Sequence, residues 1–138
     1  MLLRPALFAF CTLLLSAQPD PWQASELLPP AALAATLRAP GVKPPILFVG
    51  FPVLYKSTRI PGSEMTGPGA RPNGVELLKE AVAKLPKDKE IVIYCGCCPL
   101  SQCPNVRPAF ALLKQMGYTK VKVSKGYPTE KAAGSSGS

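Results

Sequence analysis

The sequence predicts an α/β fold with a central, mostly parallel sheet and helices on both of its faces. Three short apolar runs, at residues 46–50, 90–94 and 119–123, have the length and composition of buried strands. Helical patterns lie between these runs, and strands that alternate with helices form parallel sheets. At 138 residues, the chain is long enough for one domain with its own core.

The first half of the expected domain contains one helix, one strand and a long loop. Residues 25–38 predict a helix with Ala and Leu on one face, and Pro29 and Pro30 fall in its early part. The run ILFVG at 46–50 is continuously apolar, as in a strand covered on both faces. Residues 51–72 carry glycines and prolines at close intervals and predict a loop.

The next helix and strand follow directly. Asn73 is the predicted N-cap of a helix that runs to about Leu85, with apolar residues at helical spacing, and Pro86 stops it. Residues 90–94, EIVIY, predict the second strand.

One more helix and strand complete the predicted sheet. The pattern favours a helix from about Asn105 to Met116, with Gly117 as its C-cap. The run TKVKV at 119–123 predicts the third strand.

The first 17 residues have the pattern of a secretory signal peptide. A basic start at Arg4 precedes an apolar run over residues 6–15 that is shorter than the roughly 20 residues of a membrane span. We expect removal of residues 1–17, including Cys11, and a periplasmic or secreted protein without stable membrane insertion. An uncleaved anchor is the alternative. The domain is then expected over 18–128, followed by a flexible tail or linker at 129–138.

Charge and composition narrow the possible chemistry. The chain has 16 basic and 8 acidic residues, a net charge of +8, which becomes about +7 without Arg4. Such a surface attracts anions, but the basic residues are scattered and do not predict nucleic-acid binding. The chain contains no histidine, so mechanisms that need imidazole are excluded.

Four of the five cysteines lie in nine positions directly after the second predicted strand. In open α/β sheets, sites form beyond the carboxyl ends of strands, and Cys95 is the first residue there. The start of the following helix favours a thiolate, and Arg107 would add positive charge. Cys95 is therefore the candidate nucleophile.

Two segments resemble known motifs of one family. RIPGSEM, at residues 59–65, resembles a signature of rhodanese-like domains, and IVIYC with ALLKQMGYTKVKV resembles their active-site strand, cysteine, helix and next strand. The resemblance covers roughly residues 23–127 and includes an exported subset with a CGCCP loop followed by CPNxRPA. It implies a three-layer sandwich. One departure is Gly50, where the family commonly has aspartate.

The resemblance implies a sulfurtransferase without a cofactor or metal. Cys95 would carry sulfane sulfur as a persulfide, taken from a small anionic donor such as thiosulfate and passed to a thiol or cyanide acceptor. A monomer is expected. The implied substrate-binding residues of the loop are Gly96, Cys97, Cys98, Cys103 and Arg107.

The additional thiols leave several interpretations open. Cys95 or Cys97 could pair with Cys98 or Cys103 in a protective or resolving disulfide. Two or three thiolates could bind a soft ion such as Cu(I). Tetrahedral zinc is disfavoured because the usual paired spacing is met only by pairs that share Cys98. Purely structural disulfides are the remaining possibility.

Two functions of another kind remain as alternatives. The CGCC stretch from Cys95 to Cys98 is similar to the CxxC arrangement of thioredoxin-like thiol-disulfide oxidoreductases. Such proteins lack the RIPGSEM segment, which favours the rhodanese-like interpretation. A noncatalytic binding module on the same scaffold is the second alternative.

Overall fold

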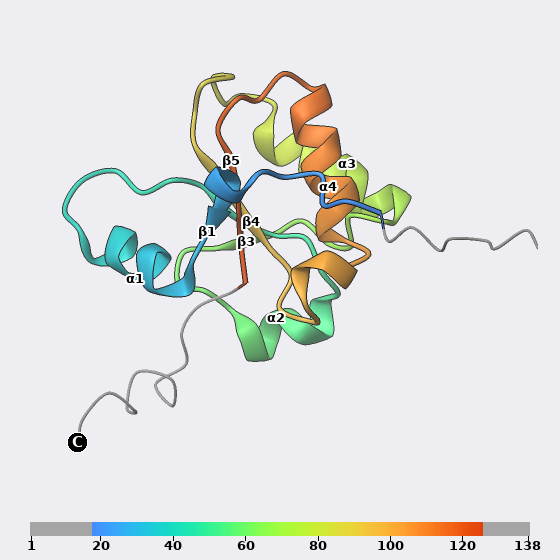
Figure 1. Cartoon of the computed structure of the whole chain (residues 1–138), viewed down its shortest axis with the longest axis horizontal. Coiled ribbons are helices and arrows are strands. Elements are labelled where there is room, and N and C mark those ends of the chain that lie inside the picture. The colour runs from blue at the N-terminus through green and yellow to red at the C-terminus, as the bar shows by residue number, and fades with distance from the viewer. Residues whose placement is uncertain (1–17, 126–138) are drawn as a thin grey trace, which may run out of the picture.

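A computed structural model describes residues 18–125 as a parallel β-sheet with helices on both faces (Figure 1). All strand pairs are parallel, and the order across the sheet is β1-β5-β4-β2-β3. The predicted fold class is therefore confirmed, with β4 at the centre of the sheet. The strands are β1 (Leu27–Leu28), β2 (Ile46–Phe48), β3 (Glu64–Met65), β4 (Ile91–Tyr94) and β5 (Val121–Ser124).

Four α-helices of the described residues form the two outer layers of a three-layer sandwich. The first two pack on one face of the sheet and the last two on the other, each pair with its own apolar core. Within residues 18–125, no helix has the length and apolarity needed to cross a bilayer. The helices are α1 (Pro30–Arg38), α2 (Pro52–Thr58), α3 (Pro72–Val82) and α4 (Val106–Gln115), with short 3₁₀ turns at Ala24–Glu26 and Leu100–Gln102.

The described range contains nearly all of the expected domain. The expected signal peptide at 1–17, with Cys11, and the expected tail at 129–138 lie outside the described residues.

The alternation of side chains along β4 decides which core each residue joins. Ile91 and Ile93 belong to the core under α3 and α4, whereas Val92 and Tyr94 belong to the core under α1 and α2. Cys95 continues this alternation and faces the α3 and α4 side. The period of two thus directs the first thiol toward the start of α4.

The helix predicted over residues 25–38 is wrong in its first part. Leu27–Leu28 form β1, which pairs with β5, and α1 begins only at Pro30. The residue before a proline is pushed toward extended backbone, so Leu28 and Pro29 cannot continue a helix into Pro30. Pro30 itself fits the first helical turn, where no backbone N–H is required.

The loop predicted over 51–72 contains two regular elements, α2 and the edge strand β3. Pro52 begins α2 at its first turn, and β3 pairs with β2 through only two residues. The predicted N-cap at Asn73 is also wrong, because Arg71 is the N-cap and Pro72 opens α3. In each case a proline that suggested a break in fact starts a helix.

The helix and strand at the end of the described chain agree closely with the prediction. Asn105 is the N-cap of α4, and Gly117 follows the helix with a φ of +93°, the left-handed conformation that glycine adopts most easily.

Candidate functional site

The cysteines follow the strand at which the sheet changes its winding direction. After β2 the chain continues to the edge strand β3, whereas after β4 it continues to β5 on the other side. The helices that follow these two strands, α2 and α4, cover opposite faces. Ligand sites in open α/β sheets form at such a switch point. The residues there are Gly50 after β2 and Cys95 after β4.

Cys95 is buried at this point, with 1% of its surface exposed. A Cβ atom on Gly50 would lie 2.8 Å from the Cys95 sulfur and 2.8 Å from Cζ of Phe48. Real side chains do not approach so closely, so the absence of a side chain at position 50 makes room for this thiol. The glycine at position 50 therefore has a local structural reason.

The chain turns sharply after Cys95. Gly96 has a φ of +74°, and a Cβ there would lie 3.0 Å from the Thr58 hydroxyl. Glycine takes this left-handed conformation without a steric cost. The turn starts a loop over residues 95–105, here called the cysteine loop, in which Leu100–Gln102 form a 3₁₀ turn and Cys103 comes back beside Cys95.

Three of the four thiols converge. The sulfurs of Cys95, Cys97 and Cys103, here called the thiol cluster, all lie within 4.8 Å of one another. The Cys95 thiol donates to the Cys97 sulfur at 3.3 Å, and the Cys97 and Cys103 sulfurs are 3.7 Å apart. Cys95 and Cys103 are buried, whereas Cys97 is exposed, and all three are free thiols. Two members of the cluster are therefore buried, and one faces the solvent.

The negative charge of the thiol cluster is favoured at Cys103. A hydrogen bond from Cys95, and backbone N–H groups of Val106 and Asn105 at the start of α4, lower the pKa of Cys103 to about 5. The hydrogen bond to Cys103 and burial raise the pKa of Cys95 well above its ordinary value of 9.0. The helix start thus stabilises a thiolate, as expected from the sequence, but on Cys103 and not on Cys95.

Cys98 lies outside the thiol cluster. Its side chain is exposed, and its sulfur does not belong to the group within 4.8 Å. Desolvation and hydrogen bonding with Cys97 raise its pKa to about 12. The CxxC pair of Cys95 and Cys98 is therefore not the closest pair of sulfurs at this site.

Arg107 joins the N-terminal segment to the cysteine loop. Its guanidinium donates to the Asp20 carboxylate at 2.7 Å, the Pro19 carbonyl at 2.8 Å and the Ser101 carbonyl at 3.2 Å. It also lies over the Trp22 ring, 5.9 Å from the centroid. Its positive charge, expected to bind an anion, is thus partly neutralised by Asp20.

Asn105 links the cysteine loop to the segment before α3. Its Oδ1 accepts a hydrogen bond from the Ala70 N–H at 3.3 Å, and the residue is 1% exposed. Its Nδ2 is buried and has no hydrogen-bond partner among residues 18–125. A buried donor without a partner is uncommon in proteins, so the Asn105 Nδ2 is an unsatisfied polar group at the base of the cysteine loop.

The RIPGSEM segment is held by the last residue of β4. The Tyr94 hydroxyl accepts from the Ile60 N–H at 3.0 Å and is 3.0 Å from Oγ of Ser63. The Tyr55 hydroxyl donates to the Ser63 carbonyl at 2.6 Å. This tyrosine network fixes the turn on the α1 and α2 side of the site.

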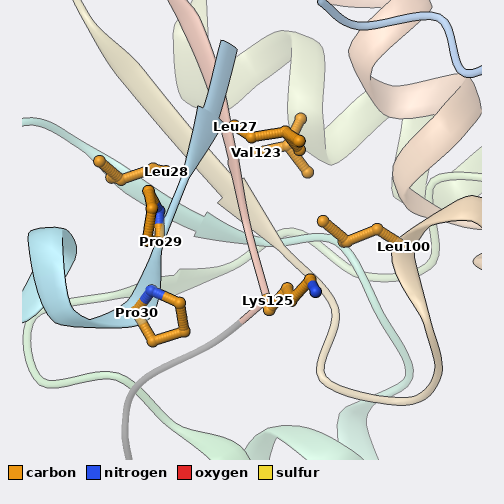
Figure 2. A pocket seen from close by; sticks show the side chains of 7 residues that line it. All are labelled: Leu27, Leu28, Pro29, Pro30, Leu100, Val123 and Lys125. Carbon is orange, nitrogen blue, oxygen red and sulfur yellow. The ribbon is translucent and has the colours of Figure 1, made fainter. Parts of the chain in front are cut away.

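Two cavities lie beside the cysteine loop. The smaller, of about 220 Å³, is mainly aliphatic, with Leu100 and Lys125 on its wall (Figure 2). The larger, of about 440 Å³, is more polar and reaches Cys98 but no member of the thiol cluster. Its lining residues are Asp20, Trp22, Leu27, Cys98, Pro99, Leu100, Ser101 and Lys125.

Sequence reasoning identified the thiols but not their supports. The space at Gly50, the unpaired amide of Asn105 and the hydroxyl of Tyr94 depend on contacts between distant segments. Only Gly50 had a signal in the sequence, as a departure from the pattern of the family that the chain resembles. No protein-family model, curated protein or solved structure matches the chain.

Proposed function

We propose that the protein is a rhodanese-like sulfurtransferase that carries sulfur as a persulfide on Cys95. The observation that carries this proposal is the position of Cys95, at the carboxyl end of the central strand and in sulfur contact with two further thiols. The motif resemblance of residues 59–65 and of the strand, loop and helix around Cys95 supports the same activity. The net charge of +8 favours an anionic donor.

The loading step transfers one sulfur atom. The Cys95 sulfur attacks the outer sulfur of a thiosulfate-like donor, the donor S–S bond breaks, and sulfite leaves with the bonding electron pair. The Cys95 proton leaves through its hydrogen bond to the exposed Cys97 and from there to water. Since Cys95 is buried and Cys97 is exposed, the donor reaches Cys95 from the Cys97 side of the loop.

The unloading step restores the thiol. A cyanide or thiol acceptor attacks the outer sulfur of the Cys95 persulfide, the S–S bond breaks, and Cys95 is released as a thiolate that regains its proton. With cyanide the product is thiocyanate. The N–H groups of Asn105 and Val106 at the start of α4 stabilise negative charge on the sulfurs during both steps.

Intact-mass measurement tests the proposal directly. The reduced full chain is incubated with thiosulfate, weighed, and then treated with cyanide while thiocyanate is measured. We expect one added sulfur atom on the unmodified chain and on the matched Cys11→Ser variant, and none on Cys95→Ser. Peptide mapping should place the sulfur on Cys95. A folded, reduced and metal-free chain that takes up no sulfur would contradict sulfur transfer and favour thiol-disulfide exchange.

A further inference from the structure

The thiol cluster has the geometry of a metal site. We propose that Cys95, Cys97 and Cys103 together bind one soft monovalent metal ion, with Cu(I) as the physiological class. This inference concerns binding and does not depend on the proposed sulfur transfer.

The sulfur separations fit a three-coordinate ion. Three thiolates at about 2.3 Å from a central metal ion, arranged in a plane, lie about 4.0 Å from one another. The observed separations are 3.3 Å between Cys95 and Cys97 and 3.7 Å between Cys97 and Cys103, and no pair exceeds 4.8 Å. A metal ion can therefore bind all three sulfurs after small movements of the side chains, with the backbone of the loop unchanged.

The chemistry of the donors selects a soft ion. All three donors are sulfurs, the chain has no histidine, and no carboxylate belongs to the group among the described residues. Soft thiolate ligands favour Cu(I) over harder ions. Structural zinc is almost always four-coordinate, whereas the sulfur of Cys98 interacts with Cys97 but does not lie within 4.8 Å of all three clustered sulfurs. A group of three sulfurs thus favours the monovalent ion.

The surroundings suit a negatively charged complex. Three thiolates and one monovalent cation have a net charge of −2. Helix α4 has its N-cap at Asn105, two residues after Cys103, and the positive end of a helix dipole stabilises such charge. Burial of Cys95 and Cys103 protects the bound ion from water, and the exposed Cys97 provides the route of access.

Anaerobic titration with Cu(I) tests the site. The reduced full chain carrying Cys11→Ser, so that the cysteine loop supplies every thiol, is titrated against a chromophoric Cu(I) chelator such as bicinchoninate. We expect one tightly bound ion per chain and three sulfur neighbours by X-ray absorption. The matched variants Cys97→Ser and Cys98→Ser then compare the loss of a thiol inside the thiol cluster with the loss of one outside it. Because Cys97 and Cys98 are both exposed, neither replacement disturbs the core.

The two variants have opposite expected results. Loss of a residue that only hydrogen-bonds to a metal ligand already weakens metal binding by roughly 10–100-fold. Cys97→Ser removes a direct ligand, so its affinity for Cu(I) should fall by more than about 100-fold. Cys98→Ser should keep the affinity of the parent chain. Equal affinity in Cys97→Ser, an equal loss in Cys98→Ser, or preferential binding of Zn(II) would each overturn the assignment.

Sulfur loading of the reduced, metal-free Cys11→Ser chain, measured beside the Cu(I) titration of the same chain, distinguishes this inference from the proposed function. A chain that loads sulfur but binds no Cu(I) would overturn the metal site alone, and a chain that binds Cu(I) but loads no sulfur would overturn sulfur transfer alone.

Discussion

Tyr94 and Cys95 are neighbours in sequence, yet they belong to two regions with different properties. The Tyr94 hydroxyl lies in a buried network with the Ile60 N–H and the Ser63 hydroxyl, both at 3.0 Å. Cys95 lies in a cluster of three free thiols, one of them exposed, in which its sulfur is 3.3 Å from that of Cys97. The network of oxygen and nitrogen atoms stabilises a turn, whereas the sulfurs are weak hydrogen-bonding groups that remain able to react. Structure and chemistry are thus divided between the two faces of one strand.

The largest expected effect concerns the charge of the thiol cluster. With the pKa of Cys103 lowered from its ordinary value of 9.0 to about 5, the reduced chain should carry a thiolate at neutral pH. The ultraviolet absorbance of thiolate should therefore rise as the pH passes about 5. This step should be absent in Cys103→Ser and retained in Cys98→Ser. A step near pH 5 that survives in Cys103→Ser would assign the thiolate to another sulfur.

A side chain at position 50 should lower both the stability of the domain and the rate of sulfur loading. Gly50→Ala places a Cβ 2.8 Å from the Cys95 sulfur, so we expect a loss of about 1–3 kcal/mol in the free energy of unfolding and slower sulfur loading. Urea denaturation and the intact-mass assay measure the two effects. Because Cys95→Ala removes one of the clashing atoms, Gly50→Ala should cost less stability in that background. Equal costs in the two backgrounds would argue that the sulfur does not limit the space.

Removal of the Tyr94 hydroxyl should lower the stability of the domain and leave sulfur loading unchanged. Tyr94→Phe leaves the buried Ile60 N–H without its acceptor, which should lower the free energy of unfolding by about 1–3 kcal/mol. Tyr55→Phe, which removes a partly buried donor to the Ser63 carbonyl, should cost only about 0.5–1.5 kcal/mol. Both variants should still load one sulfur atom. Loss of loading in the folded Tyr94→Phe chain would show that the two regions are not independent.

The smallest expected effect is at the rim of the cysteine loop. Asp20→Asn removes the ion pair with Arg107, whose partners are partly exposed, so the free energy of unfolding should change by less than about 1 kcal/mol. The exposed pair of Glu76 and Lys79 is a matched comparison, and Glu76→Gln should have a similarly small effect. If sulfur loading becomes faster in Asp20→Asn, the released Arg107 guanidinium contributes to donor binding. A loss above about 2 kcal/mol in the free energy of unfolding is more than an exposed ion pair contributes, and would show that the Asp20–Arg107 pair is needed for the stability of the domain.

The sequence alone predicted the parallel sheet, the central strand, α4 and the position of Cys95, because these depend on local hydrophobic pattern and on glycine and proline. It did not predict β1, α2 or β3. Leu27–Leu28 and Glu64–Met65 are too short for a periodic signal and become strands only through pairing with β5 and β2. Pro52 and Pro72 suggested breaks because a proline at the first helical turn is locally indistinguishable from one in a loop.

The sequence by itself determined which residues bring reactive sulfur to the end of β4, since four cysteines in nine positions after a buried strand are a local pattern. Only the tertiary structure decided how they divide. The return of the cysteine loop through Leu100–Gln102 brings Cys103 to Cys95 and Cys97 and leaves Cys98 aside. The start of α4 then directs its N–H groups to Cys103, so the thiolate forms there. The distances between the sulfurs and the electrostatic environment of each thiol depend on how the loop packs. The spacing of the cysteines along the chain does not specify this packing.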